Sequence, residues 1–249
     1  ETRVLRFSPP FSNGMAASAV LGRLPSGGYP SDPKARLRTP TGVSVSRDGS
    51  LWVTGGSRVL RFRPPFYTGM PADLVIGQPD FIASEYGTSI NRFREPFNSS
   101  VDGGGSLWVA DRSNHRVLRF DPPFSNGMDA SLVLGQPDFA SGGYSLFPSP
   151  SNMSNPASVA ADEAGDIWVA DSINGRLLKF EPPFVNGMSA SLAVGQKDLY
   201  TNCYSVGSCA VSAVMDGWAA SARETASSNR RGSAARAADV PQAPTNTKT

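Results

Sequence analysis

One recurring unit of about 58 residues restricts the folds open to this chain more than any other feature. Its most regular part is an Arg-led apolar run that starts at Arg3, Arg58, Arg116 and Arg176, at intervals of 55, 58 and 60 residues. Each run is followed by a Pro-Pro-Phe connector and by a short apolar segment that ends in Gly. A repeat of this period indicates a propeller, a solenoid or an array, because one such unit cannot bury its apolar faces alone.

Each complete unit contains four short apolar runs, rich in Val, Leu, Trp and Phe, separated by turn residues. Short runs of this composition predict β-strands and not helices. Glycines between the first and second runs, such as Gly49 and Gly165, supply the positive φ that a tight hairpin needs. Four antiparallel strands joined by hairpins make one blade of a β-propeller.

The expected fold is therefore all-β, an incomplete propeller of four-stranded antiparallel blades with a disordered carboxyl-terminal tail. About three and a half blades are readable, namely a partial blade at 1–22 and blades at 40–78, 96–136 and 156–196. We expect residues 1–212 to form the propeller part and the Ala/Ser/Arg-rich residues 213–249 to be disordered, since they hold too few large apolar residues to form a core.

The chain opens in a third strand, and the pattern stops near residue 212, where a shifted reading frame or a truncation would explain the change in composition. Because no strand is left to seal a ring, we expect it to stay open. Unpaired strand edges at its ends would then allow self-association.

Trp52, Trp108 and Trp168 recur at one register of the second predicted strand. A side chain of this size on a blade face needs the neighbouring blade to cover it. We therefore expect the three indoles at equivalent buried positions.

The residues inside the blade resemble the NHL repeat. The similarity lies in Asn155-Pro-Ala-Ser-Val-Ala, in Ile-Trp-Val-Ala-Asp171, and in Asn114-His-Arg116-Val-Leu. The first full copy departs from the pattern, since Thr54 stands where the Asp after Trp-Val is expected, and every copy carries the Pro-Pro-Phe extension. Extended repeats of this kind look like those of secreted or surface bacterial NHL proteins, so the resemblance implies an extracellular or cell-surface propeller.

Charge and cysteine content limit the partners of the chain. With 23 basic and 21 acidic residues, the net charge of +2 predicts no nucleic-acid partner. The sequence also predicts no membrane span, because no apolar run approaches the required length. Cys203 and Cys209, six residues apart, can close a small disulfide, which would suit an oxidising compartment, or remain as two free thiols.

Two sets of repeated charged residues have a functional and a structural interpretation. Asp111 and Asp171 can act as metal-binding or acid/base carboxylates, as in gluconolactonase-like relatives, or bond turn amides two residues on. Arg58, Arg116 and Arg176 can form a basic ring for RNA or bond turn carbonyls and carboxylates. We favour the structural interpretation in both cases, because a catalytic group should be singular and these groups recur with the repeat.

A structural role is also favoured for the histidine and for the connector phenylalanines. His115 is the only histidine, and one histidine in a hairpin turn cannot form a metal cluster or a proton-transfer set. The connectors place Phe11, Phe66, Phe124 and Phe184 either at a peptide-binding rim or against the outer strands, and we favour the second.

The sequence thus favours a non-catalytic scaffold that binds a protein or glycan partner and needs no cofactor. A hydrolase or lyase on the same fold is the alternative, and an inactive truncated fragment is a third interpretation. Since one fold serves many functions, the step from fold to function is an analogy.

Overall fold

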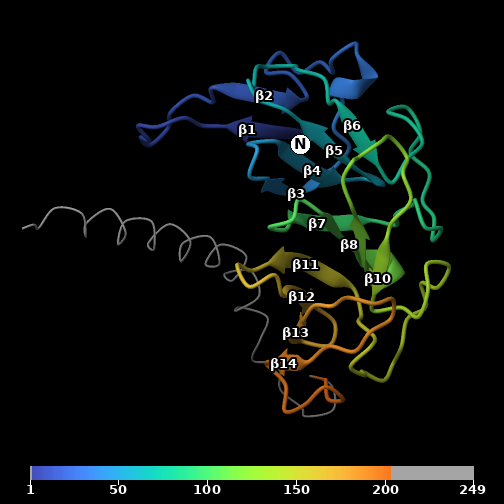
Figure 1. Cartoon of the computed structure of the whole chain (residues 1–249). Helices are drawn as coiled ribbons and strands as arrows, with labels where there is room; N and C mark the ends of the chain where they lie inside the picture. Colours follow the sequence, from blue (N-terminus) through green and yellow to red (C-terminus); the bar gives the residue numbers. More distant parts are fainter. Residues whose placement is uncertain (1, 203–249) are drawn as a thin grey trace, which may run out of the picture. The chain divides into compact units, whose positions relative to one another are not determined.

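The computed structural model describes residues 2–202, and they form four antiparallel sheets (Figure 1). The predicted disordered tail and the predicted disulfide between Cys203 and Cys209 lie outside these residues. In the described part no helix has the length and apolar character to cross a membrane.

Three of the sheets are four-stranded meanders in which each strand pairs with the next along the chain. The first consists of β3 (Pro40–Val45), β4 (Leu51–Gly55), β5 (Arg58–Phe62) and β6 (Leu74–Ile76). The second consists of β7 (Pro96–Val101), β8 (Leu107–Asp111), β9 (Arg116–Phe120) and β10 (Leu132–Leu134). The third consists of β11 (Pro156–Ala161), β12 (Ile167–Asp171), β13 (Arg176–Phe180) and β14 (Leu192–Val194). The prediction of four-stranded antiparallel blades is confirmed.

A two-stranded sheet precedes them, made of β1 (Arg3–Arg6) and β2 (Ala19–Gly22). It corresponds to the third and fourth strands of a blade. Short 3₁₀ turns at Pro33–Ala35 (η1) and Arg112–Asn114 (η2) are the only helical elements among residues 2–202. In that range β1 and β2 pair only with each other and β14 pairs only with β13, so the described sheets form three and a half blades that do not close a ring.

The hydrophobic cores lie between blades and not within them. Successive residues of a strand face opposite sides of its sheet, so each blade presents one apolar face to the blade before it and one to the blade after it. In β8, Leu107 and Val109 pack toward β3–β6, whereas Trp108 and Ala110 pack toward β11–β14. This arrangement gives the repeat its physical reason, because each sheet is covered only when its neighbours are present.

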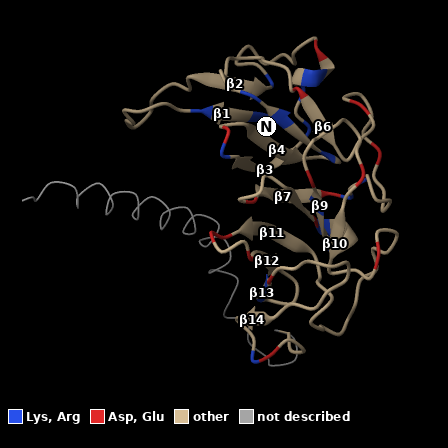
Figure 2. Ribbon diagram, viewed as in Figure 1, with Lys and Arg blue, Asp and Glu red and all other residues tan. Residues whose placement is uncertain are grey.

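The first strand of each blade contacts the first strand of the next, as β7 does with both β3 and β11. These three strands carry no charged residue and appear tan along their length in Figure 2, while Lys, Arg, Asp and Glu are interspersed over the outer strands and loops. Hydroxyl and amide groups join them, for example the buried Ser44 and Ser99 hydroxyls, whose oxygens are 3.3 Å apart.

Candidate functional site

A buried carboxylate–guanidinium pair closes the hairpin between the second and third strands of two blades. The Asp111 Oδ2 atom accepts hydrogen bonds from Arg116 Nε and Asn114 Nδ2, each at 2.8 Å, and Oδ1 accepts one from the Arg94 backbone N–H at 2.7 Å. Both charged side chains are fully buried. In the next blade Asp171 makes the same three kinds of bond, to Arg176, Asn174 and the Ser154 N–H.

The other guanidinium nitrogens of these arginines hold the long loops between blades. Arg116 Nη1 donates to the carbonyl oxygens of Thr88 and Phe139, and Arg176 Nη2 donates to those of Ser149 and Asn152 at 3.0 Å. All of these partners are backbone carbonyl groups of the same chain. The geometry therefore gives Arg116 and Arg176 an anchoring role.

The carboxylates have partners other than the expected turn amides two residues on. The amide that each one meets lies 17 residues earlier, just before the first strand of the same blade, so the aspartate joins the first strand to the second and third. Burial raises the pKa of the Asp111 carboxyl to about 6, although the Arg116 charge and the hydrogen bonds act in the opposite direction. Burial raises the pKa of Asp171 in the same way.

The blade β3–β6 breaks this pattern. Strand pairing aligns Gly55 with Arg58 as it aligns Asp111 with Arg116, so the missing carboxylate corresponds to Gly55 and not to Thr54. No side chain fits at Gly55, since a Cβ atom there would lie 2.7 Å from the Arg38 carbonyl oxygen. The backbone before β3 thus occupies the space that the carboxylate fills in the other blades.

Arg58 is left without a carboxylate although it is 2% exposed. Its Nη1 and Nη2 atoms donate to the carbonyl oxygens of Phe81 and Arg36. The buried Nε has no hydrogen-bond partner among the described residues. Burial, together with the positive charge of Arg38, lowers the pKa of Arg58 to about 10, although the negative charge of Asp80 acts in the opposite direction.

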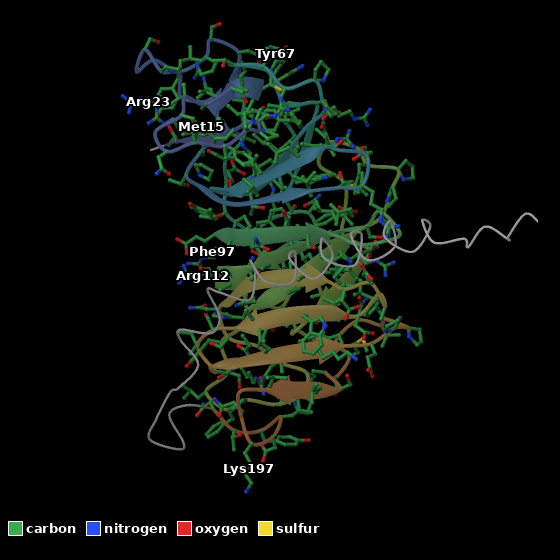
Figure 3. All side chains as sticks on the ribbon, turned by 90° about the vertical axis from the view of Figure 1, so that its left-hand side faces the viewer. Met15, Arg23, Tyr67, Phe97, Arg112 and Lys197 are labelled. Carbon is green, nitrogen blue, oxygen red and sulfur yellow. The ribbon has the colours of Figure 1, made fainter. Side chains whose placement is uncertain are left out.

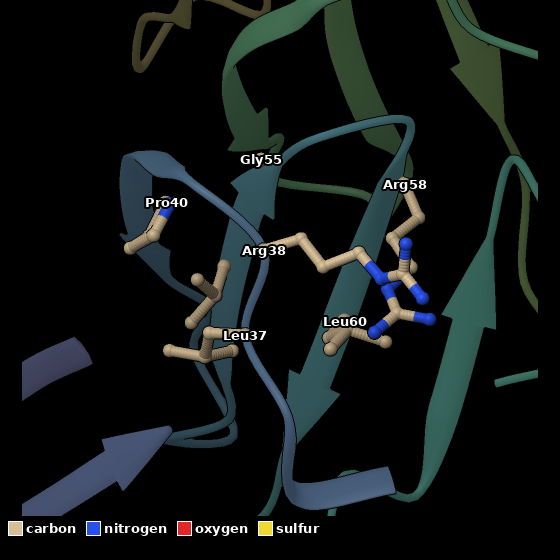
Figure 4. Close-up of a pocket in the computed structure, with 7 residues that line it drawn as sticks. Leu37, Arg38, Pro40, Gly55, Arg58 and Leu60 are labelled. Carbon is tan, nitrogen blue, oxygen red and sulfur yellow. The ribbon is translucent and has the colours of Figure 1, made fainter. Parts of the chain in front are cut away.

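A small pocket opens beside this arginine. It encloses about 180 Å³, part of it open to solvent, and it lies among Leu37, Arg38, Pro40, Val53, Gly55, Arg58 and Leu60. Figure 4 shows the guanidinium groups of Arg38 and Arg58 turned toward each other at one side of the pocket. Two cations and apolar walls make a site suited to one anionic group.

The structure distributes the other candidates over the blades without gathering them into one site. Trp52 lies on β4, Trp108 on β8 and Trp168 on β12, at equivalent register positions, with the first two buried and Trp168 half-buried. His115 Nδ1 accepts a hydrogen bond from the Asn155 backbone N–H at 3.1 Å, and burial lowers its pKa. Within residues 2–202 no three His, Cys, Asp or Glu side chains come together as a metal site.

Two of the four connector phenylalanines pack against a tryptophan of the preceding blade, whereas Phe11 is 73% exposed. Phe124 meets Trp52 edge to face with ring centroids 5.1 Å apart, and Phe184 meets Trp108 at 5.0 Å. A connector thus fastens its own blade to the one before it. Sequence reasoning placed these side chains on outer strands but did not identify the blade that receives them.

The pocket at Arg38 and Arg58 was also missed. Its signal in the sequence was the departure of one copy from the repeat, namely the lost aspartate and a turn two residues shorter. Arg38 gave no signal, because it lies in a loop outside the repeated runs.

The fold and the repeated site define a β-propeller protein built from short antiparallel blades. The family model for the NHL repeat matches residues 153–180, which span β11 to β13. The match covers one repeat unit of the chain.

Two curated relatives share part of the sequence. The chain is 34% identical over 97 residues to peptidyl-alpha-hydroxyglycine alpha-amidating lyase 1 of Drosophila melanogaster, covering 39% of this chain and 16% of that protein. It is 31% identical over 144 residues to peptidyl-glycine alpha-amidating monooxygenase B of Xenopus laevis, covering 57% of this chain and 15% of that protein. The chain therefore spans only a small part of the length of these relatives.

Solved structures with a related fold are distant in sequence. The hydrazine synthase of Kuenenia stuttgartiensis matches at a TM-score of 0.42 and 14% identity, over 67% of this chain and 38% of that one. The virginiamycin B lyase of Staphylococcus aureus matches at a TM-score of 0.34 and 14% identity, over 66% and 48%. At these values the likeness carries no argument about function.

Proposed function

We propose that this protein is a non-catalytic propeller scaffold that binds a partner protein through an acidic group held at Arg38 and Arg58. The proposal rests on the observation that the blade β3–β6 lacks the buried carboxylate that the blades β7–β10 and β11–β14 contain. A feature repeated in every blade serves the fold, whereas a singular one is free to serve a ligand. In this blade backbone occupies the place of that carboxylate, and an anionic group from outside the chain would bind beside it, at Arg38 and Arg58.

The size of the pocket supports a single group as its occupant. Pockets for whole small molecules usually enclose about 300–1,000 Å³, whereas the enclosed part of this pocket has room for about one water-sized group. A carboxylate on a side chain or at a chain end would bind at the opening of the pocket, against the guanidinium groups of Arg38 and Arg58. Hydrogen bonds between ionised groups are about twice as strong as neutral ones.

The test is a binding assay with fluorescent peptides that end in Glu, paired with the same peptides carrying Gln and a carboxyl-terminal amide. We expect the acidic peptides to bind at least about tenfold more tightly, because the neutral ones lose a charge-assisted hydrogen bond. Arg38→Ala should remove this preference. Arg63→Ala, at a 60% exposed arginine outside the pocket, is the matched control and should keep it.

Equal binding of both peptide sets, or an unchanged preference in Arg38→Ala, would contradict the proposal. A parallel array of neutral glycans and of glycans with uronic acids separates a sugar carboxylate from a protein one. Preference for the uronic acids over all peptides would overturn the assignment of a protein partner.

A lyase of the amidating type is the second candidate, and the two curated relatives named above favour it. The assay is conversion of a peptide ending in α-hydroxyglycine, the substrate named for the Drosophila relative. We expect no product above a heat-denatured control. Turnover that follows the protein through purification would replace the scaffold proposal with an enzymatic one.

A further inference from the structure

Three neighbouring pairs of blades are fastened by the same two-bond clamp. One residue of the outermost strand of one blade directs its backbone N–H and C=O to the connector of the next blade. Val75 N donates to Asn126 Oδ1 at 3.0 Å, and Gly127 N donates to Val75 O at 3.1 Å. The clamp on Val133 uses Asn186 and Gly187, with both bonds at 3.0 Å, and the clamp on Val20 uses Thr68 and Gly69, at 3.2 and 2.9 Å.

The glycine of the clamp has a positive φ and lies against the preceding blade. The φ angles of Gly69, Gly127 and Gly187 are 77°, 67° and 65°. A Cβ atom on Gly127 would lie 2.9 Å from the Cα of Pro79, so only glycine allows this approach. Each clamp therefore consists of an acceptor side chain, a glycine N–H and the connector phenylalanine two or three positions earlier.

The edge strand β14 presents the receiving half of such a clamp. Ala193 has the register position of Val75 and Val133, since it pairs with Leu178 as they pair with Leu60 and Leu118. Its flanking residues Leu192 and Val194 are 44% and 42% exposed. The corresponding side chains of β6 and β10 are at most 5% exposed.

The half blade β1–β2 presents the inserting half. Its connector contains Phe11, Asn13 and Gly14 in the order found at the internal clamps. Gly14 already has a φ of 73°, and the Met15 N–H donates to the Ser12 carbonyl at 3.3 Å, the same turn and distance as in the other three connectors. Phe11 is 73% exposed and Gly14 has no neighbouring atom where its Cβ would lie.

We propose that β14 of one molecule binds the Phe11–Met15 connector of a second copy, head to tail. Asn13 Oδ1 accepts from the Ala193 N–H, and the Gly14 N–H donates to the Ala193 carbonyl. The two halves lie at opposite ends of the described part, where Figure 3 labels Met15 and Lys197. A heterologous contact of this kind joins unlike surfaces and extends from copy to copy. The connector is held in the docking conformation before contact, which lowers the entropic cost of association.

The experiment is sedimentation velocity on the full chain at increasing protein concentration. We expect the average sedimentation coefficient to rise with concentration. Two variants should each remain monomeric, Phe11→Ser/Asn13→Ala, which disables the inserting half, and Ala193→Pro, which removes the outward N–H. Pro is tolerated on an edge strand where the N–H points away from the sheet.

Mixing the two variants gives the sharpest result. The first keeps a working β14 and the second keeps a working connector, so together they should form a one-to-one complex that neither forms alone. Ser12→Ala and Ala193→Val are the matched controls, and both should associate as the wild type does. If Ala193→Pro loses its β-sheet circular dichroism, Leu192→Asp replaces it as the variant with a disabled β14.

Each alternative result overturns the proposal. A wild-type protein that stays monomeric shows that β14 does not receive a second copy. Association that survives the variants at both halves shows a contact elsewhere. Mixed variants that do not combine show that the contact does not join these two surfaces.

Discussion

The blades β3–β6 and β7–β10 use the same hydrophobic plan but differ in their buried polar groups. Trp52 and Trp108 occupy the same register and are 2% and 0% exposed, and each receives a connector phenylalanine from the following blade. At the hairpin between its second and third strands, the blade β7–β10 buries the side chains of Asp111, Asn114 and Arg116. The blade β3–β6 has Gly55 and a backbone segment in the place of the aspartate. The comparison shows that the apolar interface defines the blade, while the buried carboxylate can be exchanged for backbone.

The first prediction tests the apolar interface, which both blades share. Trp52→Ala and Trp108→Ala should each lower the free energy of unfolding by about 3–5 kcal/mol, because both leave a large cavity between blades. Denaturant melts followed by circular dichroism measure the loss. Trp168→Ala should cost less, since its indole is half-buried. A loss below about 1 kcal/mol for Trp108→Ala would contradict the interblade core as the source of stability.

The second prediction tests the buried carboxylate beside the arginine, which only the blade β7–β10 of these two contains. Arg116→Met should destabilise by about 3–5 kcal/mol, because it leaves the Asp111 carboxylate buried without its charge partner. Arg58→Met should cost about 1–3 kcal/mol, since it leaves only carbonyl oxygens unpaired. The same denaturant melts compare the two variants. Equal losses would show that the missing carboxylate makes no difference to its arginine.

The third prediction concerns Gly55. Gly55→Ala should destabilise by about 1–3 kcal/mol, as overpacking does, because the new methyl group meets the carbonyl oxygens of Arg38 and Thr39. Gly28→Ala is the control, since a Cβ atom there has no neighbour within 4 Å. If both variants melt at the same denaturant concentration, the backbone before β3 is not held against Gly55.

The smallest expected effect is a pH dependence that only the blade with a carboxylate can have. The folded-state pKa of Asp111, about 6, lies above the ordinary value of 3.8. The folded protein therefore holds this proton more tightly than the unfolded chain does. Its contribution to stability is fully present below pH 3.8 and is lost as the pH rises through about 6.

Chemical unfolding between pH 4 and 7 measures this contribution as the difference between the wild type and Asp111→Asn. As the pH rises, the free energy of unfolding of the wild type should fall relative to that of Asp111→Asn. Parallel curves for the two proteins would show that Asp111 does not change its protonation on folding in this range.

The identity of the blade and its strands could be predicted from the sequence, because strand periodicity and turn residues are local properties. The Arg-led runs marked the third strand of every blade, and the glycine-containing turns marked the first hairpins. The candidate site was harder to predict from the sequence. The departure of one copy was visible, but it was assigned to Thr54, whereas strand pairing places Gly55 at the position of Asp111.

The sequence by itself determined the unit, the number of readable copies and the residues that recur in each. The tertiary structure decided which unit each side chain serves. Phe124 packs on a tryptophan 72 residues earlier, and Asn126 binds the backbone of Val75, across a boundary between blades. It also brought Arg38 beside Arg58 by closing the backbone onto Gly55. A repeat shows what each unit contains, but contacts between units depend on the three-dimensional path of the chain, which local sequence patterns do not encode.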